Sequence, residues 1–194
     1  MKRVRIGCGA GFADDRIEPA AELAERGGLD YLVFECLAER TVALAQLDRL
    51  RDPEAGYNEW LADRMDAVLE SCARDGVRII TNMGAANPVA AARVVAEVAR
   101  RKGIGSLRVA AVTGDDVLSA VKGSDLQLLE RDGETVASLG DTVISASAYL
   151  GAEPVIEALR QGADVVVGGR IADPSCSWPR WRTSSAGVPP TGRC

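Results

Sequence analysis

The amino-acid sequence predicts an α/β fold: a mostly parallel sheet of about six strands with helices on both faces, as in Rossmann-like proteins. Two observations favour this class. Short runs of β-branched and apolar residues alternate along the chain with longer stretches whose apolar residues recur at helical spacing, which is typical of repeated βαβ units. Most of the helical stretches also end at glycine, the residue that a left-handed C-cap favours.

The expected strands are short apolar runs, each followed by glycine or small polar residues, so each suits a buried strand of a parallel sheet. In chain order they lie at residues 4–8, 31–34, 77–81, 107–112, 142–145 and 164–167. The expected helices lie between them, at residues 18–26, 41–50, 59–74, 88–102 and 152–161. Asn87 followed by Pro88 is typical of an N-cap and a first-turn proline.

Two segments interrupt this alternation. Residues 52–58 separate two helices, and Asp132-Gly133 between short alternating runs indicates a small antiparallel hairpin. The alternative architecture is an incomplete (β/α) barrel, because about six strands would make up most of an eight-stranded barrel. The interrupted helices and the hairpin favour the open sheet.

Composition limits the classes of function that the chain can serve. Of its 194 residues, 47% are hydrophobic and 26% are charged, and the net charge is −5. No apolar run approaches the length of a membrane span, so we expect a cytoplasmic protein without membrane contact. The acidic balance offers nucleic acid no basic face. The absence of histidine excludes Ser-His-Asp and Cys-His catalysis and histidine-ligated metals, and the five cysteines lack the spacing of a zinc site.

Residues 176–194 differ in character from residues 1–175, which we take as the α/β domain. They contain three arginines and no acidic residue, together with two of the three tryptophans and three of the eight prolines. They show neither helical nor strand periodicity. Two interpretations stand: an irregular, disordered C-terminal tail, or a change of reading frame after Ser175 that yields a truncated product.

Glycines follow the first expected strand, where a ligand site is expected. Ligands of parallel α/β proteins bind beyond the carboxyl ends of the strands. Gly9 and Gly11 belong to a glycine-rich turn whose backbone amides could bind an anion at a helix N-terminus. A tight turn that needs a positive φ explains these glycines equally well.

Acidic residues at the same edge are candidates for acid–base catalysis. Glu35 directly follows the apolar run 31–34, and Asp14 follows the glycine-rich turn. Because closely spaced carboxylates can raise one pKa for proton transfer, we expect Glu35 and Asp14 to be catalytic. Asp115 and Asp116 fit helix N-caps better. Acidic clusters also suit Mg²⁺ or Mn²⁺, but the sequence identifies no cofactor and we assign no metal site.

Four further residues are expected to bind the substrate. Asn82 and Asn87 bracket a loop of small residues against which a ligand could lie, and turn and cap hydrogen bonds explain both equally well. Arg170 follows a strand that opens into a glycine pair, where a guanidinium could hold a phosphate or carboxylate in a fork. An ion pair between Arg170 and Asp173 explains this arginine equally well, and Asp173 completes the set.

Five sequence blocks resemble, in order, the N-terminal domain of the acyclic terpene utilisation (AtuA) family. They lie at residues 6–16, 30–39, 81–88, 147–152 and 162–174, and they include the strings IGCGAGFADDR, DYLVFECLAE and GADVVVGGRIADP. The resemblance covers nearly all of residues 4–175. Beyond the last block, members of the family continue with a leucine-rich helix, where this sequence departs from them.

The resemblance implies a function in the bacterial catabolism of citronellol- and geraniol-type terpenes, or of related branched acids carried as CoA thioesters. We therefore expect an enzyme or enzyme subunit that binds a small anionic or acyl substrate at the carboxyl edge of the sheet. The alternatives are a non-catalytic binding or scaffold subunit of the same pathway and an inactive truncated product. The resemblance assigns no catalytic residue, and it leaves a homo-oligomer open.

Overall fold

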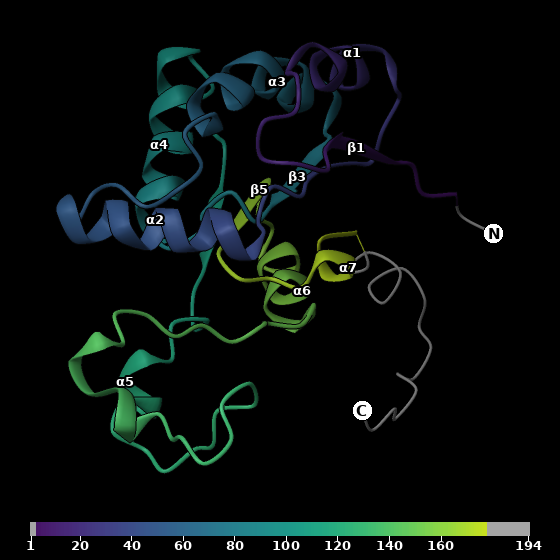
Figure 1. Cartoon of the computed structure of the whole chain (residues 1–194). Coiled ribbons are helices and arrows are strands. Elements are labelled where there is room, and N and C mark those ends of the chain that lie inside the picture. Colours follow the sequence, from purple (N-terminus) through teal and green to yellow (C-terminus); the bar gives the residue numbers. More distant parts are fainter. Residues whose placement is uncertain (1–2, 178–194) are drawn as a thin grey trace.

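The computed structural model describes residues 3–177 and contains, within them, a five-stranded sheet whose strands are all parallel (Figure 1). The strand order is β1-β2-β3-β5-β4. The strands are β1 (Ile6–Ala10), β2 (Tyr31–Phe34), β3 (Arg78–Thr81), β4 (Val109–Val112) and β5 (Val165–Gly168). The predicted α/β class is therefore confirmed, with slightly fewer strands than expected.

Helices connect the strands and cover both faces of the sheet. They are α1 (Glu18–Arg26), α2 (Glu39–Arg51), α3 (Leu61–Asp75), α4 (Pro88–Arg101), α5 (Leu118–Val121), α6 (Glu153–Arg160) and α7 (Asp173–Ser177), with a 3₁₀ helix η1 (Ala137–Thr142). In Figure 1, α1, α3 and α4 lie on one side of the sheet, and α6 and α7 lie on the other. The predicted two-sided arrangement is confirmed.

The core has two layers because successive strand residues point to opposite faces. In β2, Leu32 and Phe34 pack with the layer under α1, α3 and α4, whereas Tyr31 and Val33 pack with the layer under α6 and α7. All four side chains are buried. This explains why β2 appears in the sequence as a continuous apolar run rather than as an alternating one.

Residues 117–147, which we call the excursion, leave the sheet after β4 and return before α6. Val117 N donates to Ala146 O at 3.0 Å, so the two ends of the excursion lie together. The predicted hairpin is present as an antiparallel bridge between Gln127 and Thr135. The predicted strand at 142–145 is wrong: Thr142 is the last residue of η1 and Ile144 is exposed, and among the described residues this segment is not part of the sheet.

The strand order places a topological switch point between β3 and β5, two parallel neighbours whose following connections leave for opposite faces of the sheet. The chain leaves β3 for α4 on one face and leaves β5 for α7 on the other, and the insertion of β5 between β3 and β4 rules out the sequential order of a barrel. A Cβ at Gly84 would lie 2.5 Å from the carbonyl oxygen of Gly168, so the two chain segments are in close contact. Ligands of open parallel sheets bind at such a switch point.

Helix α7 carries the first two residues, Cys176 and Ser177, of the segment that the sequence sets apart. Cys176 is fully buried in the layer that contains Val166 and Ile171. The rest of that segment, including Trp178 and Trp181, lies outside the described residues. Within residues 3–177, none of the helices is both long enough and apolar enough to span a membrane.

Candidate functional site

Glu35 and Asn82 lie side by side at the carboxyl ends of β2 and β3. Asn82 Nδ2 donates to Glu35 Oε1 at 2.9 Å, and Asn82 Oδ1 accepts from Cys36 N at 2.7 Å. Leu37 N also donates to Glu35 Oε1, at 3.1 Å. Asn82 is fully buried and Glu35 is half-buried. Asn82 therefore fixes the orientation of the Glu35 carboxylate, and both of its polar side-chain atoms make hydrogen bonds to the protein.

Arg170 lies at the carboxyl end of β5 in contact with Tyr149 and Glu39. Its Cζ is 4.2 Å from the centroid of the Tyr149 ring, and its Nη2 donates to Glu39 Oε1 at 2.7 Å. Its backbone N donates to Asp115 Oδ2 at 2.8 Å. The partner of its ion pair is therefore Glu39, not Asp173 as one interpretation of the sequence had it.

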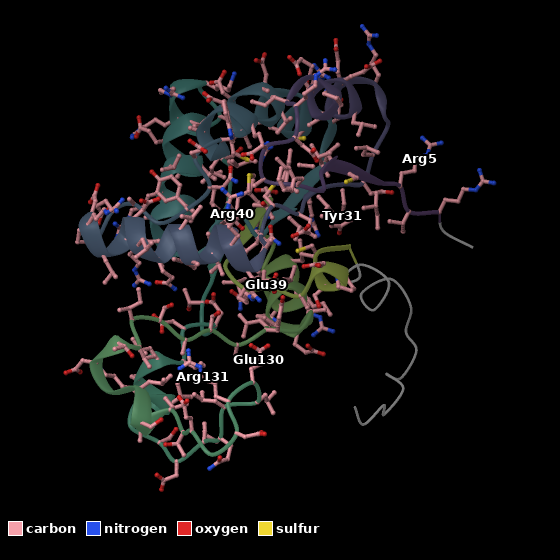
Figure 2. The ribbon with its side chains drawn as sticks, viewed as in Figure 1. Arg5, Tyr31, Glu39, Arg40, Glu130 and Arg131 are labelled. Atoms are coloured by element: carbon pink, nitrogen blue, oxygen red, sulfur yellow. The ribbon has the colours of Figure 1, made fainter. Side chains whose placement is uncertain are left out.

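The pair formed by Arg170 and Glu39 is unequal in exposure. The Arg170 side chain is 10% exposed, whereas that of Glu39 is 80% exposed. Figure 2 shows Glu39 at the start of α2, near the middle of the molecule. The pKa of Glu39 is lowered, first by a hydrogen bond from its own backbone amide and then by hydrogen bonds from Arg170 and Tyr149. The exposed, ionised carboxylate of Glu39 thus pairs with the nearly buried guanidinium of Arg170.

The glycine-rich turn is occupied by groups of the chain itself. Gly9 lies inside β1, where a Cβ would come within 2.6 Å of the Phe34 ring. Gly11 N donates to Asp15 Oδ2 at 2.8 Å. Neither glycine has a positive φ, so close packing at Gly9, rather than backbone conformation, is what requires glycine. Asp14 is exposed on the same loop.

Asn87 anchors a helix and a loop. Its Oδ1 accepts from Ala90 N at 3.2 Å, as an N-cap does, and its Nδ2 donates to the carbonyl oxygens of Pro53 and Ala55, both at 2.8 Å. The cap interpretation of the sequence is therefore what the geometry supports. Asp173 is exposed at the start of α7.

Replacing Asn87 with alanine is expected to lower the free energy of unfolding by about 1–2 kcal/mol, because one cap and two loop hydrogen bonds are lost. Urea denaturation measures this change. Asn87→Asp keeps the cap acceptor and loses the two donors, so it should fall between the wild type and Asn87→Ala. An alanine variant as stable as the wild type would contradict the anchoring function.

Arg64 is a buried residue at this edge that sequence reasoning missed. It is fully buried in the first turn of α3. Its Nη2 donates to the carbonyl oxygens of Ala13 and Asp15 at 3.0 and 2.7 Å, and its Nη1 lies 3.1 Å from Cys36 Sγ. Within the described residues its Nε has no hydrogen-bond partner. Its position three residues after Leu61, on the apolar face of α3, could have revealed it.

Asp115, Glu39 and Tyr149 were also missed as members of the site. The N-cap interpretation of Asp115 is wrong, because this carboxylate is buried and accepts from the backbone of Arg170. Tyr149 and Glu39 stand in two of the blocks that resemble the AtuA family, but their pairing with Arg170 leaves no local signal in the sequence. In the described part of the chain, no three His, Cys, Asp or Glu side chains form a group able to hold a metal ion.

The buried cysteines are thiols rather than thiolates. Burial raises the pKa of Cys36 to about 12, and the neighbouring Arg64 opposes this shift only in part. Burial likewise raises the pKa of Cys176 to about 12. Both side chains therefore act as neutral packing groups at neutral pH.

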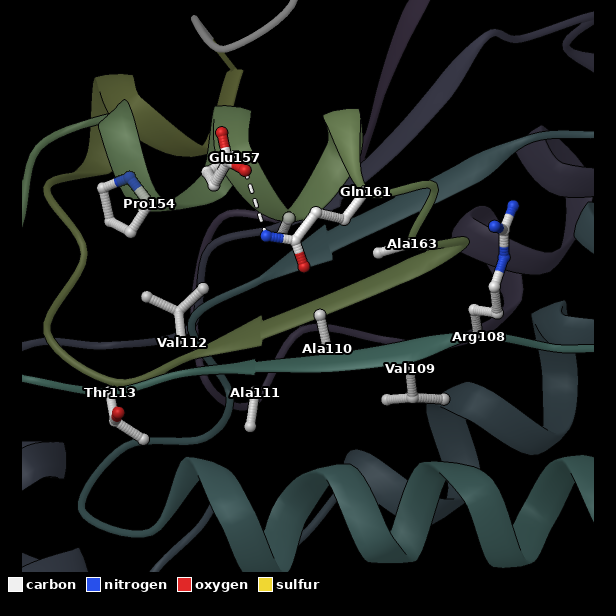
Figure 3. A pocket seen from close by; sticks show the side chains of 11 residues that line it. Arg108, Val109, Ala110, Ala111, Val112, Thr113, Pro154, Glu157, Gln161 and Ala163 are labelled. Atoms are coloured by element: carbon white, nitrogen blue, oxygen red, sulfur yellow. Dashed lines mark hydrogen bonds between the residues drawn. The ribbon is translucent and has the colours of Figure 1, made fainter.

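An open groove of about 420 Å³ runs along the outer edge of β4, away from these residues. Figure 3 shows Ala110 of β4 pointing toward α6, which contributes Pro154 and Glu157 across the groove. The groove is separated from β3 by β5, and apart from Arg108 and Glu157 its lining carries no charged side chain. We therefore place the candidate site at the carboxyl ends of β2, β3 and β5 instead.

These features define a class: an open parallel α/β domain with an arginine and a positioned carboxylate at the carboxyl edge of the sheet. The chain belongs to the AtuA family, because the model of that family, described as "Acyclic terpene utilisation family protein AtuA", matches residues 4–179. Searches of curated proteins and of solved structures gave no match. This match confirms the resemblance seen in the sequence. Membership of the family gives the protein a role in acyclic terpene utilisation.

Proposed function

We propose that the domain binds an anionic acyl substrate of this catabolism, such as the CoA thioester of a branched terpenoid acid, at the carboxyl edge of the sheet. The observation that carries the proposal is the state of Arg170. Its guanidinium is nearly buried beside the topological switch point between β3 and β5. Its hydrogen-bonded partner is the exposed carboxylate of Glu39. A desolvated guanidinium is the protein group best suited to a carboxylate or phosphate.

The guanidinium of Arg170 has capacity for a further anion. Within residues 3–177 only its Nη2 makes a hydrogen bond to the protein, so the remaining N–H groups are available to a ligand. The face of the Tyr149 ring supports the cation at 4.2 Å. A phosphate or carboxylate could therefore bind in the bidentate geometry that arginine favours.

Glu35 is the residue we propose for proton transfer. Asn82 holds its Oε1 at 2.9 Å, and within the described residues its Oε2 accepts no hydrogen bond. A fixed carboxylate with one free oxygen at the ligand-binding edge can take or give a proton. Asp14 is the second candidate, and Asp173 is a further ligand contact that we propose at this edge.

Replacing Arg170 with methionine is expected to weaken the binding of citronelloyl-CoA at least about tenfold, because a charge-assisted contact is lost. Isothermal titration calorimetry measures this affinity. Arg108→Met is the matched control, since Arg108 is an exposed arginine that directly precedes β4 at the opposite end of the sheet. Equal affinities of Arg170→Met and the wild type would overturn the proposal.

A thermal-shift measurement and a turnover assay with citronelloyl-CoA separate catalysis from binding alone. Glu35→Gln keeps an oxygen that can accept from Asn82, so we expect its melting temperature to stay within a few degrees of the wild type while turnover is lost. Binding without turnover in the wild type would favour the non-catalytic binding subunit. Absence of a cooperative melt would favour the inactive product.

A further inference from the structure

One carboxylate oxygen at the site, Glu39 Oε1, accepts hydrogen bonds from donors on two neighbouring segments. Glu39 Oε1 accepts from Arg170 Nη2 at 2.7 Å and from the Tyr149 hydroxyl at 3.2 Å. The Arg170 side chain is 10% exposed and Tyr149 is 58% exposed. The two donors therefore mark a position for one anionic oxygen at the surface of the domain.

The donors are held by the backbone, independently of Glu39. Leu150 N donates to Arg170 O at 2.9 Å, and Ala148 N donates to Asp115 O at 2.8 Å. Asp115 in turn accepts from Arg170 N. The segment that carries Tyr149 is thus tied to the strand end that carries Arg170, and the pair of donors does not need Glu39 to stay together.

Glu39, in contrast, reaches this position from the first residue of α2, and its side chain is 80% exposed. A side chain with that exposure can turn into solvent without breaking the packing of the core. Its carboxylate is negatively charged and offers acceptor oxygens, as the anionic group of the proposed substrate does. It can therefore be exchanged for that group.

We propose that Tyr149 is a second binding residue for the anionic group of the substrate, and that Glu39 is an internal competitor that this group displaces. An oxygen of the ligand then takes the position of Glu39 Oε1 between Arg170 and Tyr149. This inference rests on the proposed function. The competition lowers the apparent affinity by the fraction of molecules in which Glu39 occupies the position.

Calorimetric titrations of the full chain test the exchange, with CoA and citronellate as separate probes for a phosphate and a carboxylate. Glu39→Gln is expected to bind the responding probe about tenfold more tightly than the wild type, because the competing charge is removed. Tyr149→Phe keeps the ring under Arg170 but lacks the hydroxyl, and it should bind about three- to tenfold more weakly.

Glu54→Gln is the matched control, because Glu54 is also an exposed carboxylate that pairs with an arginine, Arg93, at 2.9 Å. It should leave the affinity unchanged. If Arg170→Met abolishes binding but Glu39→Gln does not strengthen it, the displacement is overturned and the proposed function stands. If neither the wild type nor Glu39→Gln binds either probe, both are overturned.

Discussion

Replacing Arg64 with methionine is expected to lower the free energy of unfolding by about 2–4 kcal/mol. The guanidinium donates to the carbonyl oxygens of Ala13 and Asp15, and methionine would leave these acceptors without a donor. The substitution also removes a buried cation that has no carboxylate partner among its hydrogen bonds, which offsets part of the loss. The unsatisfied carbonyl oxygens decide the sign, because each costs about 1–3 kcal/mol.

Guanidinium chloride denaturation measures this difference. Arg101→Met is the control: Arg101 is exposed on α4, and substitutions at such positions stay within about 0.5 kcal/mol. A variant at Arg64 that is as stable as the wild type would show that the loops after β1 and β2 hold together without it.

Replacing Gly84 with alanine is expected to destabilise the domain by about 2–3 kcal/mol and to weaken ligand binding. The new Cβ would lie 2.5 Å from Gly168 O and 2.8 Å from Pro88 Cα. Both are backbone atoms, so no side chain can move aside. The ends of β3 and β5 must separate instead, and this displaces the segment that carries Arg170.

Thermal denaturation and calorimetry with citronelloyl-CoA measure the two effects. Gly105→Ala is the matched control, because nothing lies within 4 Å of its Cβ position. It should be neutral or slightly stabilising. If Gly84→Ala melts like the control, the contact between the two strand ends does not constrain the domain.

The sequence was most predictive where local signals agree with burial. β2 lies at residues 31–34 and α1 at residues 18–26 as expected, because one is a continuous apolar run and the other ends before a glycine pair. The expected strand at 142–145 failed because apolar, β-branched residues form a strand only where a neighbouring strand and an apolar layer exist. Neither of these is local information.

The sequence predicted at which edge of the sheet the candidate residues lie, but not which of their side chains contact one another. Arg170, Glu35 and Asn82 could be placed because each follows an expected strand. The contact between Arg170 and Glu39 joins residues 131 positions apart in the chain, and it depends on a strand order that the sequence does not contain. The burial of Arg64 was not predicted, because a charged residue on a helix is usually exposed.

The strand order also bears on how the chain folds as it leaves the ribosome. β1, β2 and β3 are neighbours in the sheet in the order in which they are synthesised, so they can pair as they emerge. β4 has β5 as its strand neighbour among the described residues, and β5 follows it by more than the whole excursion. A nascent chain that has exposed β4 but not β5 must keep an apolar strand unpaired, and in that interval it is most open to association with other chains.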